Sequence, residues 1–174
     1  MRVSVLSSVL LLALGAQSIV GGDAASGQFK TKGKTFPLKH AFAYTTEGKV
    51  TVMGKERAEK TLHVILSDKP FDTVALGGET DPNRAIMRQA KTTEASYLDI
   101  RMDSDGKLKE VCWCPDYRTG LNWEGTPGEG TLKLQLSRRD AKQVAGLLKT
   151  ESGTHAVDWV ADLRFDAPSV QAVR

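Results

Sequence analysis

Apolar and polar side chains alternate with a period of two along most of the chain from Lys34 onward. Successive side chains of a β-strand point to opposite faces, so this period is typical of strands that bury one face. The segment between residues 155 and 165 shows it most clearly, because every second side chain there is apolar or histidine. This face comprises His155, Val157, Trp159, Ala161, Leu163 and Phe165.

Two neighbouring segments with this alternation are predicted to form a hairpin. Ser96–Asp103 and Lys107–Cys114 are joined through Asp105 and Gly106, a pair that tolerates the positive φ angles of a tight turn. The other predicted strands are Thr35–Thr46, Thr61–Ser67 and Thr131–Ser137.

Asp81 to about Lys91 is the one segment predicted to be a helix. Asp81 is a favourable N-cap residue, and Pro82 suits the first helical position because its missing N–H would be unused there. Arg139–Thr150 fits either a helix or a strand, since its apolar spacing is helical but Gly146 weakens a helix.

These patterns predict one mainly β domain over residues 34–174. The chain has 174 residues and a mass of 18.9 kDa, which is the size of a single domain. Its composition, 40% hydrophobic and 26% charged, is that of an ordinary globular protein and not of a coiled coil or a disordered chain. We predict an antiparallel β-sandwich or barrel of about 7–9 strands with one short helix at about 81–91.

The N-terminal segment resembles a secretory signal peptide. Arg2 precedes a mostly apolar run from Val3 to Ala16, which is shorter than the ~20 residues that span a membrane as a helix. Small residues follow, so we predict a signal peptide over 1–18 with cleavage between about 16 and 25, then a flexible leader over 19–33. An uncleaved membrane anchor and a buried first helix are the alternatives. The mature protein is predicted to be extracytoplasmic, either periplasmic or secreted, without a stable membrane span.

The charge balance excludes proteins built around phosphate neutralisation. Lysine and arginine number 24 and aspartate and glutamate 21, which gives a net charge of +3. Loss of residues 1–18 removes Arg2 and no acidic residue, so +3 becomes +2. The basic residues are scattered among acidic ones, and we predict no nucleic-acid partner.

The two cysteines, Cys112 and Cys114, form a C-x-C pair. Within a strand their side chains share one face and their Cα atoms lie ~6.6 Å apart, near the upper limit for a disulfide. A structural role, bridged or buried, is the main interpretation. A redox-active pair and a metal-associated pair are the alternatives, although we predict no cofactor and no metal.

The three histidines lie within predicted strands, which favours histidines that are hydrogen-bonded in the core or at its edge. No motif of a catalytic nucleophile accompanies His40, His63 or His155, so we assign no catalytic residue. The alternative is a small hydrolase that uses one of these histidines in a cleft.

The segment Asp116–Gly130 is predicted to be a long loop. Tyr117, Arg118 and Trp123 make it a possible binding loop, because aromatic and arginine side chains dominate binding surfaces. In the alternative interpretation, Trp123 folds back onto the end of the β domain.

Two motifs resemble a family of uncharacterised bacterial secreted proteins with a short β-rich domain. They are Gly33–Tyr44 (GKTFPLKHAFAY) and Val64–Pro70 (VILSDKP). Val144–Thr150 is similar to a strand of that family, which favours a strand there. The resemblance implies a fold and a compartment but no activity. We therefore expect a non-enzymatic extracytoplasmic module that binds a protein or an envelope component, with a small hydrolase or a thiol-redox or metal protein as alternatives.

Overall fold

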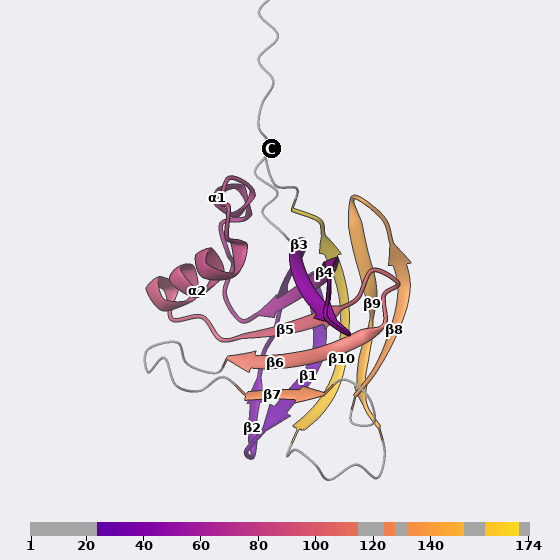
Figure 1. Ribbon diagram of the computed structural model, residues 1–174. Helices are drawn as coiled ribbons and strands as arrows, with labels where there is room; N and C mark the ends of the chain where they lie inside the picture. Colours follow the sequence, from indigo (N-terminus) through magenta and orange to yellow (C-terminus); the bar gives the residue numbers. More distant parts are fainter. Residues whose placement is uncertain (1–23, 115–123, 128–131, 152–158, 171–174) are drawn as a thin grey trace, which may run out of the picture.

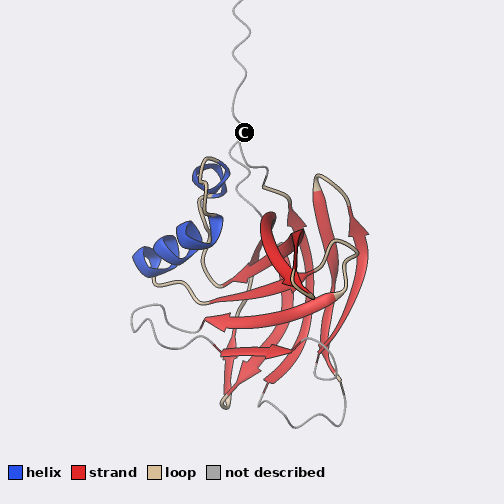
Figure 2. Ribbon diagram, viewed as in Figure 1, coloured by secondary structure: helices blue, strands red, loops and turns tan. Residues whose placement is uncertain are grey.

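The computed structural model describes residues 24–114, 124–127, 132–151 and 159–170. These residues form two antiparallel sheets of five strands each, which pack face to face, with two short helices beside them (Figures 1 and 2). The prediction of a mainly β antiparallel sandwich is confirmed.

Sheet A has the strand order β2-β1-β10-β9-β8. Its strands are β1 (Ala25–Thr31), β2 (Lys34–Phe36), β8 (Leu132–Arg139), β9 (Gln143–Thr150) and β10 (Trp159–Pro168). Sheet B follows the chain, with the order β3-β4-β5-β6-β7. Its strands are β3 (His40–Val52), β4 (Lys55–Ser67), β5 (Tyr97–Met102), β6 (Leu108–Cys114) and β7 (Glu124–Pro127).

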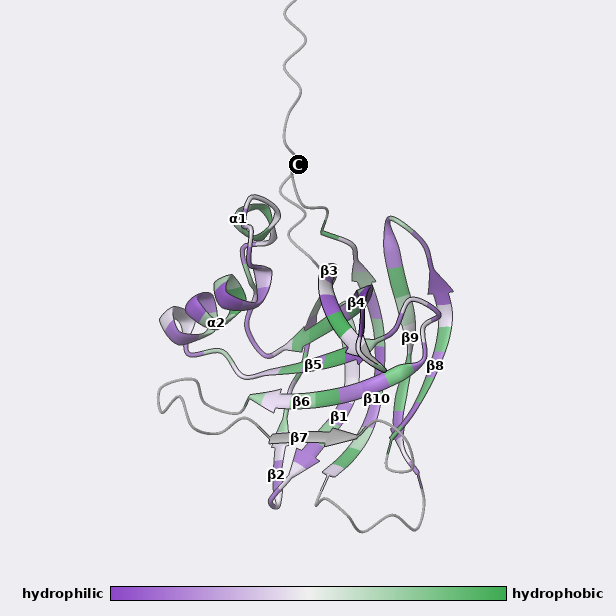
Figure 3. Ribbon diagram, viewed as in Figure 1, coloured by the Kyte–Doolittle hydropathy of each residue, from purple (hydrophilic) through white to green (hydrophobic). Residues whose placement is uncertain are grey.

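The inner faces of both sheets share one hydrophobic core. Its aromatic centre joins the sheets, because Phe29 of β1 lies 4.7 Å from Trp113 of β6 and 5.6 Å from Trp159 of β10 between ring centroids. Phe29 and Trp113 are fully buried. Figure 3 shows hydrophobic segments along strands of both sheets, as expected where apolar burial drives the packing.

The predicted flexible leader over 19–33 is wrong for residues 25–31, which form β1. This strand lies between β2 and β10, and it pairs with β10 from Ala25 to Thr31. Its small residues suggest a flexible chain, but Gly27 is needed for the close approach of β10. A Cβ atom there would lie 2.0 Å from the carbonyl oxygen of Asp162. The predicted signal peptide lies outside the described residues.

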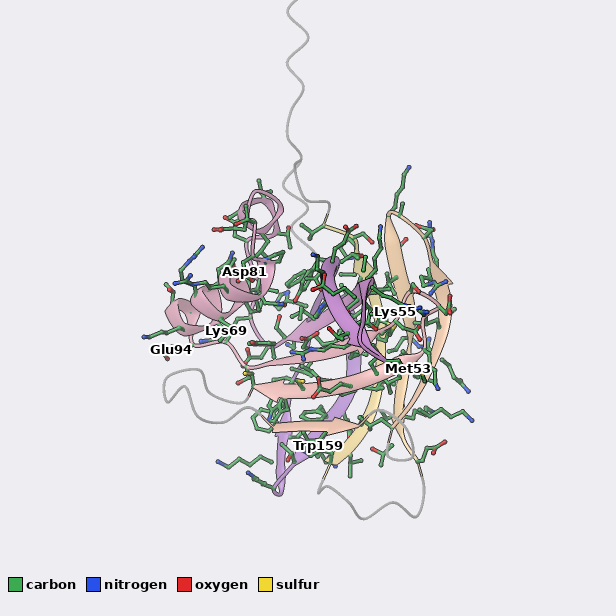
Figure 4. All side chains as sticks on the ribbon, in the orientation of Figure 1. Met53, Lys55, Lys69, Asp81, Glu94 and Trp159 are labelled. Carbon is green, nitrogen blue, oxygen red and sulfur yellow. The ribbon has the colours of Figure 1, made fainter. Side chains whose placement is uncertain are left out.

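The predicted helix is confirmed as α2 (Pro82–Thr93), which begins after the N-cap Asp81 (labelled in Figure 4). The Asp81 carboxylate accepts from the Arg84 N–H at 3.0 Å. A second helix, α1 (Thr73–Gly77), was not predicted, because its five residues are too few to show a helical period. The buried side of both helices packs on the outer face of sheet B, so this part of the sheet is covered on both faces.

Three other predictions are settled by the strands. Arg139–Thr150 contains β9, so the strand interpretation is correct. Asp105 and Gly106 lie in the turn between β5 and β6, and Gly106 has a φ of 85°. The predicted strand Thr35–Thr46 is divided at Pro37 into β2 and β3.

Candidate functional site

A cleft of about 1210 Å³ opens between the two sheets at one end of the sandwich. Its wall on sheet B carries Thr45 and Glu47 from β3 and Lys60 and Leu62 from β4. The β8–β9 connection and Val144 of β9 line the cleft from sheet A. Figure 1 shows these elements at the end of the molecule where β3, β4 and β9 are labelled.

The cleft begins where the inner face of sheet B changes from apolar to polar. On β3, Ala41 and Ala43 are buried, but the next two side chains on this face, Thr45 and Glu47, are exposed. Lys60, which pairs with Glu47 across the strands, is exposed as well. Because these polar side chains keep their hydration, the shared core ends here.

The charged side chains on the sheet B side of the cleft are held by partners within the protein. Lys60 Nζ lies 2.8 Å from Oε1 of Glu47. Oδ1 of Asp103, in the β5–β6 turn, accepts from the N–H groups of Lys107 at 2.8 Å and Asp105 at 2.9 Å. These hydrogen bonds hold the pKa of Asp103 below its usual value.

The charges at the end of β8 and in the β8–β9 connection are held in the same way. Arg139 Nη1 donates to the carbonyl oxygen of Ser104 at 2.7 Å. The Asp140 carboxylate accepts from Arg138 Nε at 2.6 Å, and this bond lowers the pKa of Asp140. The side chains around the cleft therefore form ion pairs and turn contacts among themselves, and charge alone does not define a ligand.

The chain after β10 lines the cleft and joins the two sheets. Ser169 N–H donates to the carbonyl oxygen of Lys142 at 2.8 Å, and Val170 N–H donates to that of Ala43 at 2.7 Å. Ser169 and Ala43 form a parallel bridge at the outer edge of β3. The edge of β3 thus already accepts one extended segment.

A second polar site lies on the outer face of sheet B and centres on His63. Its Nδ1 atom lies 3.0 Å from Oδ1 of Asp99, and its Nε2 atom lies 3.1 Å from Oγ1 of Thr46. The ring of Tyr44 stacks on the imidazole with 4.6 Å between centroids. His63 and Asp99 are both buried, whereas Thr46 is partly exposed.

The Asp99 carboxylate also binds Arg101, whose guanidinium continues the network to the surface. Arg101 Nε donates to Oδ2 of Asp99, and its Nη1 donates to Oε2 of Glu110, both at 2.8 Å. Tyr44 donates its hydroxyl proton to Oδ1 of Asn83 at 2.6 Å, and burial raises the pKa of this phenol. A cavity of about 120 Å³ lies between this network and α2.

Two residues of the His63 network, Asp99 and Arg101, lie on the polar face of the predicted strand Ser96–Asp103. A polar face ordinarily indicates solvent, but α2 and the neighbouring strands cover this one. The predicted burial of His63 is confirmed, and the structure adds the carboxylate and the hydroxyl beside it. His40 is partly exposed, and His155 lies outside the described residues.

Cys112 and Cys114 are buried on the outer face of sheet B, and both thiols are free. Burial raises the pKa of each thiol, so both hold their protons at neutral pH. Protonated thiols are poor nucleophiles and poor metal ligands, which favours the structural interpretation of the pair. Within the described part of the chain, no three His, Cys, Asp or Glu side chains cluster as metal ligands would.

The candidate binding-loop residues Tyr117, Arg118 and Trp123 lie outside the described residues. No helix in the described ranges is long and apolar enough to cross a bilayer. Comparisons of the chain with protein-family models, with curated proteins and with solved structures found no match.

Proposed function

We propose that this protein is a non-enzymatic extracytoplasmic β-sandwich module that binds a protein or an envelope component in the cleft between its sheets. The observation that carries the proposal is the cleft itself, whose volume of about 1210 Å³ is that of a substantial binding site. Sheet B leaves polar side chains on an inner face at this end, where further apolar residues would have closed the core.

Photo-crosslinking in the source cells tests this proposal. A photoreactive amino acid at Thr45 lies in the cleft, and the same residue at Thr35, an exposed position on β2, serves as the control. We expect one discrete adduct from Thr45 that is absent from Thr35. Equal adducts from both positions, or none from Thr45, would refute a ligand site in the cleft.

The extracytoplasmic location has its own support in residues 1–18, which have the charge and apolar pattern of a signal peptide. N-terminal sequencing of the protein recovered outside the cytoplasm tests it. We expect the mature chain to begin between about Gln17 and Ser26. A protein that keeps Met1 and stays in the cytoplasm would overturn the assignment.

A small hydrolase is the second candidate, because Thr46, His63 and Asp99 have the spacing of a nucleophile, a base and an orienting carboxylate. In such a step Thr46 Oγ1 would attack an ester carbonyl and pass its proton to His63 Nε2. His63 would then return that proton to the leaving alcohol. Arg101 weakens this candidate, since its ion pair with Asp99 reduces the negative charge available to an imidazolium.

Incubation with p-nitrophenyl acetate separates the two candidates. A hydrolase would release p-nitrophenol and carry an acetyl group on Thr46, and the Thr46→Val variant would lose both signals. Thr45→Val is the matched control, because Thr45 lies on the opposite face of β3. Unmodified Thr46 with unchanged p-nitrophenol release in the two variants would leave His63 with a structural role.

A further inference from the structure

We propose that the occupant of the cleft is an extended peptide segment of a partner protein, which adds to the outer edge of β3 as a further strand. This inference rests on the proposed function, because it names the class of ligand for the same cleft. Strand addition of this kind takes its affinity from main-chain hydrogen bonds and its specificity from alternate side chains.

β3 offers its backbone on the side of the cleft. The carbonyl oxygen of Ala43 points to the outer edge, since it accepts from Val170 N–H at 2.7 Å. In an antiparallel pair, alternate residues direct both backbone groups to the same side, so Thr45 and Lys49 face this edge too. No backbone partner for these two residues occurs at this edge in the ranges that the structure describes.

Ser169 and Val170 show that this edge accepts an added chain, because they already pair with β3 at Ala43. Both residues line the cleft or lie beside it, and Thr45 is the next edge-facing residue along β3. A partner segment seated there would continue the same hydrogen-bonding line past Val170.

The other sheet edges are less suited to an added strand. β2 and β7 have three and four residues, too few for a long ladder. β8 has eight residues, but its register shifts between Leu136 and Arg138, and such irregularities blunt an edge. β3 has 13 residues paired with β4 in unbroken register, so it is the long, regular edge.

The walls of the cleft define the side chains that the peptide would carry. Leu62 and Val170 give apolar surface inside the cleft, while Lys60 is paired with Glu47 and Arg139 donates to the Ser104 carbonyl oxygen. Every second side chain of an added strand points the same way. We therefore expect small or medium apolar residues at alternate positions and polar residues between them.

Selection of random decapeptides against the immobilised mature protein supplies a defined probe. We expect enriched sequences with apolar residues at alternate positions, and we expect the best one to shift the backbone amide NMR signals of Thr45 and Lys49. Enrichment of no peptide, or of peptides that shift only signals of β8 or α2, would overturn the inference.

Backbone methylation of the selected peptide tests the hydrogen bonds directly. N-methyl groups on the alternate amides that face β3 should weaken binding by about tenfold or more, as loss of one or two hydrogen bonds implies. N-methyl groups on the intervening amides should change the affinity by less than about threefold. Equal sensitivity of the two sets would contradict strand addition.

Substitution of Thr45 by proline removes the edge-facing N–H, and Thr45→Ala is the control that keeps it. Proline is tolerated on an edge strand where the N–H points away from the sheet, and the peptide methylation series does not depend on how this variant folds. We expect the proline variant, but not the alanine variant, to lose about tenfold in affinity.

Two other occupants of the edge are outcomes of the same experiments. A shift of the Thr45 amide NMR signal that appears without peptide, together with a concentration-dependent dimer, would assign the edge to a second copy of the chain. Peptide binding that appears only after residues 171–174 are deleted would assign it to the chain's own end. Either result would overturn the proposal of a partner peptide.

The failure of this inference is distinguishable from failure of the proposed function. A non-peptide adduct at Thr45 in the cells, with no peptide enriched in the selection, would keep the binding function and reject the peptide. Absence of any adduct at Thr45 would reject the proposed function itself.

Discussion

Nδ1 of His63 lies 3.0 Å from Oδ1 of Asp99 across the neighbouring strands β4 and β5, and both side chains are less than 5% exposed. The second carboxylate oxygen of Asp99 accepts from Arg101 Nε at 2.8 Å. One buried carboxylate thus holds a histidine and an arginine on the outer face of sheet B, in the layer that α2 covers.

We expect Asp99→Asn to lower the free energy of unfolding by about 3 kcal/mol, because it removes the anion that two buried or half-buried partners need. Urea unfolding followed by tryptophan fluorescence measures this change. Glu56→Gln is the matched control, since its ion pair with Lys49 is exposed on both sides and should contribute less than about 1 kcal/mol. Equal losses in the two variants would contradict a structural role for the Asp99 network.

The buried thiols predict a loss of stability at alkaline pH. Burial raises the pKa of Cys112 and Cys114 in the folded protein, whereas unfolded thiols ionise near pH ~8.5. Above that pH the unfolded chain binds fewer protons than the folded one, so the free energy of unfolding falls as the pH rises. Below about pH 8 this contribution is fully present and the stability does not depend on it.

Urea unfolding at several pH values between about 7 and 10 measures this slope. The variant with both cysteines replaced by alanine should show a smaller slope, with the remainder due to groups such as Tyr44, whose pKa burial also raises. The same slope in both proteins would exclude the thiols as its cause. Thiol titration with Ellman's reagent should find two slow thiols in the native protein and two fast ones in urea.

The strands could be predicted from the sequence where one face is apolar and the other polar. β5, β8 and β10 follow this rule, and the hairpin turn at Asp105 and Gly106 is local chemistry. β1 could not be predicted, because its small residues are required by the close approach of β10, which is more than 100 residues away in the chain.

The candidate sites were harder to predict than the strands. His63 and Asp99 are 36 residues apart, and they meet only because β4 pairs with β5 in one particular register. The two helices separate these strands in the chain, so no short turn fixes that register. The cleft exists because β3 continues past the core from Thr45 onward. Alternation of side chains does not show where the opposite sheet ends.

Replacement of Gly27 by alanine is expected to have a large effect on stability, although it adds only a methyl group. Its φ is 109°, and an added Cβ atom would lie 2.0 Å from the carbonyl oxygen of Asp162. We expect Gly27→Ala to lower the free energy of unfolding by more than about 3 kcal/mol, because β1 and β10 would have to separate.

Gly48→Ala is the control for this substitution. Gly48 also lies in a strand, but a Cβ atom there would meet nothing within 4 Å, and its φ is not in the left-handed region. Thermal unfolding should show Gly48→Ala within about 1 kcal/mol of the unchanged protein. A folded Gly27→Ala variant of similar stability would contradict the observed pairing of β1 with β10.

Met53 and Gly54 form the two-residue turn between β3 and β4, where Met53 and Lys55 are labelled in Figure 4. Met53 has a φ of 51° and Gly54 a φ of 76°, and positive values at both positions define a type I′ turn. Methionine is unfavourable in the left-handed region, and this side chain is 99% exposed, so burial does not compensate for the strain.

Asparagine adopts this conformation more readily, and we expect Met53→Asn to raise the free energy of unfolding by about 0.5–1 kcal/mol. Thr51→Asn, two residues away within β3, should instead lower it slightly, because asparagine is disfavoured in strands. A loss of stability in Met53→Asn, measured by urea unfolding beside this control, would show that the exposed methionine makes a contact that offsets its strained backbone.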